Sequence, residues 1–78
     1  MNVIQLNAQL QRLPTNWLIQ MGKQYGVTLS SNDVELIKRH MQHLASNGAT
    51  INDVKQTLFQ LLDEQTAKKL FELLQLYA

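Results

Sequence analysis

Residues 30–54 read SSNDVELIKRHMQHLASNGATINDV, and this stretch shows how one helix begins and ends and how the next begins. Ser30, followed three residues later by Asp33, resembles a capping box in which Asp stands in the place of Glu. Asn47-Gly48 stops the helix, because Gly readily adopts the left-handed conformation in which helices often end. Between these signals, apolar residues at helical spacing form one face: Val34, Ile37, Met41 and Leu44. The pattern predicts a helix that begins near Ser30 and ends before Asn47.

The same signals continue along the chain in both directions. Thr50, again with an acid three residues later, begins another helix, and Asp63 can cap a last one. Pro14 ends a first helix over residues 2–12, and a second helix begins at Pro14 or at the next residue, with Gly26 just past its end. The apolar stripes of these four helices, in chain order, are Val3, Leu6, Leu10 and Leu13; Trp17, Leu18, Met21 and Tyr25; Ile51, Val54, Leu58 and Leu61; and Ala67, Leu70, Phe71, Leu74 and Tyr77.

These patterns predict one all-α domain over residues 1–78, a compact bundle of four to five short helices. No alternating run of β-branched and aromatic residues indicates a strand. The 78 residues are too few for a Rossmann domain, a barrel or a two-domain enzyme. A domain of this size has a thin stability margin, which favours an efficient helical core or burial against a partner.

Composition excludes further classes. The net charge is +1, hydrophobic residues make up 45% of the chain, and there is no Cys. A disulfide scaffold or a zinc finger needs cysteines, a disordered tail is less hydrophobic, and a strongly electropositive nucleic-acid binder carries a larger charge surplus. No stretch approaches the roughly 20 apolar residues of a membrane span, and the N-terminus lacks the features of a signal peptide. We therefore expect a cytoplasmic protein that does not enter a membrane.

The sequence contains no pattern that predicts catalysis or metal binding. Asp63 and Glu64 are adjacent, so on a helix they point about 100° apart and do not share a proton. His40 and His43, three residues apart, can face one metal ion, but zinc needs a third ligand that the same helix face does not supply. We expect a non-enzymatic protein with no cofactor, no metal and no small-molecule substrate.

One hypothesis is that the chain binds DNA. Residues 15–46 resemble a helix-turn-helix, with Gly22 where the two helices touch and Gly-Val-Thr at the turn. The candidate nucleic-acid-binding residues on the second helix are Lys38, Arg39, Gln42 and His43. Glu35 stands three and four residues before the two cations and can neutralise both.

The preferred hypothesis is a protein-interaction module. Apolar residues of the last helix cover more than one stripe: Leu70, Phe71, Leu73, Leu74, Leu76 and Tyr77. Such a helix is either threaded through the middle of the bundle or presents a groove or dimer surface. Trp17 poses the same choice between core and interface. The predicted partner-binding residues are Trp17, Leu73, Leu76 and Tyr77, and the partner is another protein or a second copy of this chain.

The segment LQRLPTNWLIQMGKQYGVTL, residues 10–29, resembles the YqfT-like family of small proteins of unknown function from Bacillus-type bacteria, and so does the later QTAKKLF, residues 65–71. The similarity extends over most of residues 6–77 and consists mainly of Lys-Gln-Tyr-Gly at 23–26 and the apolar pattern. The chain departs from the family at residues 14–17, where the family tends to have Thr-Pro and two acids. The resemblance implies an all-helical domain, and it transfers no activity, ligand or site residue.

Overall fold

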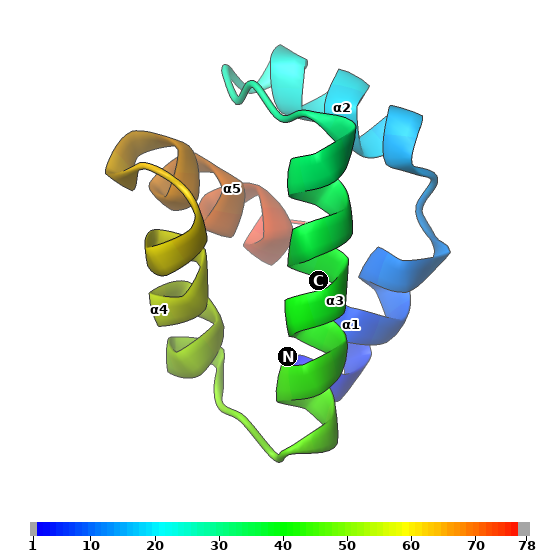
Figure 1. Cartoon of the computed structure of the whole chain (residues 1–78), viewed down its shortest axis with the longest axis vertical. Coiled ribbons are helices and arrows are strands. Elements are labelled where there is room, and N and C mark those ends of the chain that lie inside the picture. The colour runs from blue at the N-terminus through cyan, green and yellow to red at the C-terminus, as the bar shows by residue number, and fades with distance from the viewer. Residues whose placement is uncertain (1, 77–78) are drawn as a thin grey trace.

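The computed structural model describes residues 2–76, which form five α-helices. These are α1 (Val3–Arg12), α2 (Thr15–Gln24), α3 (Ser31–Ser46), α4 (Ile51–Leu61) and α5 (Glu64–Leu76). In Figure 1, α3 stands in the middle, with α1 and α2 toward one side and α4 and α5 toward the other. Helix α3 packs against α1, α2 and α4, and α5 packs mainly against α4. The prediction of an all-α bundle of four to five short helices is confirmed.

The helix boundaries follow the capping signals. Ser30 Oγ accepts from the backbone N–H of Asp33 at 3.1 Å, and Asp33 Oδ2 accepts in return from the N–H of Ser30 at 3.0 Å. Thr50 and Asp53 form the same reciprocal pair at the start of α4. These bonds satisfy donors that a helix N-terminus otherwise leaves open. Both predicted capping boxes are confirmed.

Two glycines and one aspartate form the other predicted boundaries. Gly26 after α2 has φ +80° and Gly48 after α3 has φ +68°, a conformation that costs a residue with a Cβ about 1–2 kcal/mol. Asp63 Oδ2 accepts from the backbone N–H of Thr66 at 3.2 Å at the start of α5. Hydrogen bonds from the Thr66 side chain and from the Thr66 N–H hold the pKa of Asp63 below its ordinary value, because they favour the ionised carboxylate.

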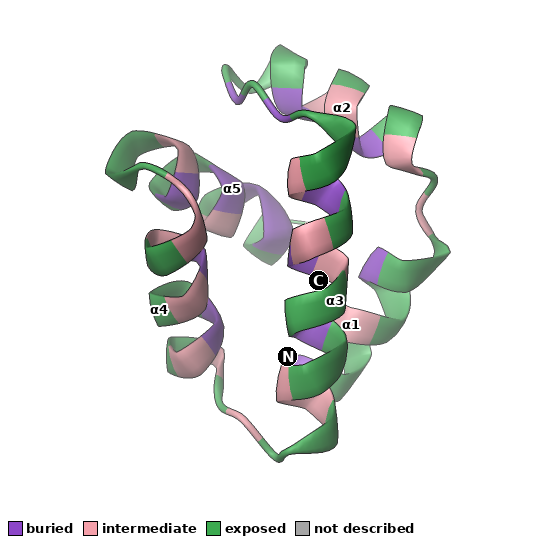
Figure 2. Ribbon diagram, in the orientation of Figure 1, coloured by how far each residue is buried: buried purple, intermediate pink, exposed green. Residues whose placement is uncertain are grey.

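The core lies between the helices and is apolar. Figure 2 shows buried positions along the faces that the helices turn toward one another. The largest fully buried side chains are those of Met41, Leu58, Val27, Val34 and Val54, and no polar side chain is buried among residues 2–76. Most predicted stripe positions are buried or half-buried. None of the helices in this part of the chain is long and apolar enough to cross a membrane.

Tyr25 is an exception to the predicted stripes. It stands at the C-cap of α2 and is 46% exposed. The prediction that Tyr25 faces inward is wrong, because it assumed helical geometry at a residue where α2 has already ended.

Gly22 is buried within α2, where an added Cβ would lie 3.1 Å from the carbonyl oxygen of Val27. This close approach explains why a residue without a side chain stands there.

Candidate functional site

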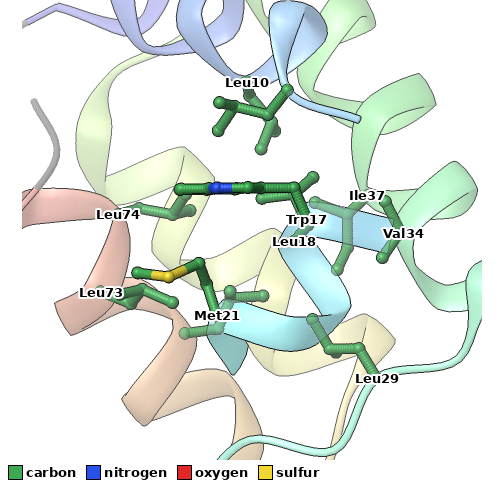
Figure 3. Close-up of a pocket in the computed structure, with 11 residues that line it drawn as sticks. Leu10, Trp17, Leu18, Met21, Leu29, Val34, Ile37, Leu73 and Leu74 are labelled. Carbon is green, nitrogen blue, oxygen red and sulfur yellow. The ribbon is translucent and has the colours of Figure 1, made fainter. Parts of the chain in front are cut away.

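A small apolar cavity lies where α1, α2, α3 and α5 meet (Figure 3). Its volume is about 30 Å³. It is lined by Leu10, Leu13, Trp17, Leu18, Met21, Leu29, Val34, Ile37, Leu70, Leu73 and Leu74. Every one of these side chains is hydrophobic, so the cavity presents an apolar surface and offers no charged group to a ligand.

Trp17 forms one wall of the cavity and is accessible from outside. Figure 3 shows its indole lying across the cavity, with Leu10 on one side and Met21 and Leu73 on the other. Pro14 supplies the extended residue that starts α2, and Leu18 anchors the helix in the core. Trp17 precedes Leu18 by one residue, or about 100° around the helix, and so lies at the edge of the buried face with 37% of its surface exposed.

The four predicted partner-binding residues have different placements. Trp17 and Leu73 are brought together in the cavity wall. Leu73 is only 5% exposed, and the prediction that it offers an exposed docking surface is wrong, because it belongs to the core and lines the inner wall of the cavity. Leu76 is 69% exposed, one turn further along α5. Tyr77 lies outside the described residues.

Leu13 and Met21 complete the accessible wall of the cavity, and the sequence did not mark them as site residues. Both are half-buried, whereas most other lining residues belong to the core. Met21 stands four residues after Trp17, so helical spacing alone places the two side chains on one face. Leu13 reaches the cavity because the chain turns at Pro14, and no sequence signal specifies that direction.

Among the predicted nucleic-acid-binding residues, Lys38 has a structural role. Its Nζ donates a hydrogen bond to the carbonyl oxygen of Leu13, the residue that caps the C-terminus of α1. Gln11 Nε2 donates to the carbonyl oxygen of Lys38 at 2.8 Å. These two bonds tie the last turn of α1 and its C-cap residue to α3. Lys38 is half-buried, and holding Leu13 engages the ammonium that a phosphate contact would use.

The remaining candidates on α3 are exposed. Arg39, Gln42 and His43 lie on the solvent face of the helix together with Glu35. The connection from α2 to α3 covers residues 25–30, longer than the roughly 3–4-residue turn of a helix-turn-helix. Helix α3 is also in contact with α1, α2 and α4, which leaves only this one face available.

Replacing Lys38 by methionine is expected to lower the free energy of unfolding by about 1–2 kcal/mol, because the carbonyl of Leu13 loses a charged donor in a partly buried position. Urea denaturation measures this change. The matched control is Arg39→Met, on the neighbouring exposed position, which is expected to change stability by less than about 0.5 kcal/mol. Equal effects of the two substitutions would contradict a structural role for Lys38.

The two histidines of α3 are exposed, and within residues 2–76 no group of three or more His, Asp or Glu side chains is placed to hold a metal ion. The apolar cavity at Trp17 is therefore the strongest candidate site that the described chain offers. Comparison of the chain with protein-family models, with curated proteins and with solved structures gives no match.

Proposed function

We propose that this chain is a cytoplasmic, non-enzymatic protein-interaction module, a small regulator, adaptor or inhibitor that binds its partner over the cavity at Trp17. The observation that carries the proposal is the position of Trp17, an exposed tryptophan over an entirely apolar cavity. Tryptophan is enriched among the residues that dominate binding energy, especially where it is held rigidly in a packed setting.

The binding energy that Trp17 can supply supports the proposal. The exposed 37% of Trp17 is roughly 90 Å², and covering it contributes about 2 kcal/mol at 25 cal/mol per Å². The surface around Trp17 is also suited to contact with another protein, because α1 and α2 expose mainly Gln and Asn residues and no acid. Polar, weakly charged groups around an apolar centre are the usual arrangement of a non-obligate interface.

The test compares two exposed aromatic residues on α2 and its cap. Tagged protein, Trp17→Ala and Tyr25→Ala are used to capture partners from the native lysate with and without nuclease, and bound proteins are identified by mass spectrometry. We expect a defined partner that survives nuclease, is retained by Tyr25→Ala and is lost with Trp17→Ala. Tyr25 is the matched control because it is exposed but does not line the cavity. Circular dichroism confirms that both variants are folded.

Two outcomes contradict the proposal. If Trp17→Ala captures the same partner as the unchanged protein, the docking surface lies elsewhere. If the captured material disappears with nuclease, the interaction is with nucleic acid, and Arg39 on the exposed face of α3 is the residue to reverse next.

A further inference from the structure

Asn47 stands directly before Gly48 in the turn that follows α3, and both residues are exposed (Figure 1). An asparagine followed by glycine is chemically reactive, because the backbone nitrogen of the glycine can attack the side-chain amide of the asparagine. Glycine has no Cβ to shield this nitrogen. Among the described residues beyond its two chain neighbours, none has an atom within 4 Å of the position that a Cβ would take at Gly48. The turn is therefore sterically open to the reaction.

The attacking nitrogen of Gly48 is also available. At this end of α3, the N–H groups of Asn47 and Ala49 donate to the carbonyl oxygen of Leu44, at 3.2 and 3.1 Å. The N–H of Gly48 stands between them and donates to no group within residues 2–76. Its nitrogen can therefore lose a proton to solvent without the loss of a hydrogen bond.

Two other exposed asparagines, Asn32 and Asn52, differ from Asn47 in this respect. Each lies within a capping box and precedes an aspartate whose backbone N–H donates to the N-cap hydroxyl, at 3.1 Å in α3 and 3.3 Å in α4. Both aspartates also carry a Cβ beside the nitrogen. The helix caps thus engage the attacking nitrogen at two asparagines, whereas the turn leaves it available at Asn47.

We propose that Asn47 is a site of spontaneous deamidation, with water as the only co-reactant. The deprotonated nitrogen of Gly48 bonds to Cγ of Asn47, the bond between Cγ and Nδ2 breaks, and the leaving nitrogen takes up a proton and departs as ammonia. Water then opens the resulting cyclic imide at either of its two carbonyl groups. The products are aspartate or isoaspartate at position 47, each with a carboxylate in place of a neutral amide, and ammonium.

Deamidation weakens the end of α3. Asn47 Nδ2 donates to the carbonyl oxygen of His43 at 2.8 Å, and a carboxylate has no hydrogen to donate there. The new charge also lies at the C-terminus of the helix, which is the negative end of its dipole. In isoaspartate the backbone gains one methylene group, which moves the N–H of Ala49 away from the carbonyl of Leu44. The connection from α3 to α4 therefore loosens as the protein ages.

The first test incubates the folded protein at physiological temperature over a series of pH values, with ion-exchange chromatography to follow charge and peptide mapping to locate the change. We expect a product whose formal net charge falls from +1 to 0, because a carboxylate replaces an amide. Its rate is expected to rise with pH, since the Gly48 nitrogen must lose a proton. Conversion at Asn32 and Asn52 is expected to be at least about ten-fold slower, and to accelerate in urea, where the cap bonds are lost.

The second test uses three variants. Asn47→Gln keeps the amide on a longer side chain that closes the ring less readily, and the acidic product is expected to disappear. Asn47→Asp reproduces one product directly, and urea denaturation is expected to show a folding equilibrium constant lowered about five- to thirty-fold. Asn32→Asp makes the same change in the first turn of the same helix, where the dipole favours a carboxylate, and is expected to maintain or raise the constant.

The proposal is overturned if Asn47 stays intact in the incubated protein, if the product maps to Asn32 or Asn52, or if Asn47→Gln still yields it. An Asn47→Asp variant as stable as Asn32→Asp contradicts the loosening of α3. Neither test involves the cavity at Trp17, so both outcomes are independent of the proposed function.

Discussion

Leu73→Glu is expected to unfold the domain. Leu73 is buried in the core, where burying a leucine contributes about 1.5–3 kcal/mol. The substitution also places a carboxylate among apolar side chains, and an uncompensated buried charge costs about 3–5 kcal/mol. A domain of 78 residues has a total stability of about 4–12 kcal/mol, with small domains toward the lower end. The combined loss is therefore comparable to the whole stability.

Leu76→Glu is the matched control, since it makes the same chemical change one turn along the same helix. Its side chain is already largely in solvent, so the expected change in unfolding free energy is within about 0.5 kcal/mol. Thermal unfolding followed by far-UV circular dichroism measures both variants at low protein concentration, where self-association contributes little. A stable, fully helical Leu73→Glu would show that Leu73 does not belong to the core.

This contrast also determines how the cavity can be tested. Leu73 forms part of the wall behind Trp17, so its loss removes the binding surface and the fold together. Trp17 is accessible, so we expect the domain to stay folded when it is changed. Binding experiments at this site therefore need variants of Trp17, and a loss of binding in a Leu73 variant carries no information about the interface.

Helix boundaries could be predicted from the sequence because their causes are local. A capping box needs only a hydroxyl and a carboxylate three residues apart, as at Ser30 and Asp33. A helix stop needs only a residue that tolerates positive φ, as at Gly48. The all-α class follows from these signals and from the periodicity of the apolar residues, without knowledge of which helix packs on which.

The assignment of Leu73 and Leu76 could not be predicted, because the end of α5 is apolar on several sides. Periodicity alone does not choose which side faces the core when leucines occupy positions 73, 74 and 76. The choice depends on where α2 lies, since Leu73 lines the cavity together with Trp17 and Met21. That arrangement depends on packing between residues more than fifty positions apart in the chain.

The structural role of Lys38 could not be predicted either, because it also depends on a contact between residues that are distant in the chain. Its position beside Arg39 favoured a solvated or DNA-facing pair, and both residues are on the helix that a helix-turn-helix would use for recognition. The hydrogen bond to the carbonyl of Leu13 joins residues 25 positions apart. No local pattern indicates that the C-terminus of α1 ends within reach of this lysine.

Met41→Ala is expected to lower the free energy of unfolding by about 2–5 kcal/mol, the range for removing a large side chain from a packed core. Met41 is 1% exposed and is among the largest fully buried side chains. It stands on the buried face of α3, the helix that packs against α1, α2 and α4. The neighbouring Gln42 is exposed, so Gln42→Ala is the control and is expected to change stability by less than about 0.5 kcal/mol.

Urea denaturation of Met41→Ala should be followed with two probes, the emission of Trp17 and the far-UV circular dichroism. Trp17 reports on α2 and the cavity, whereas the dichroism reports on all five helices. Because α3 connects the α1–α2 side to the α4–α5 side, we expect the two transitions to coincide at a lower midpoint. If the Trp17 transition came first, α2 would unfold separately from the bundle, and the cavity would be held by a locally unstable helix rather than by the shared core.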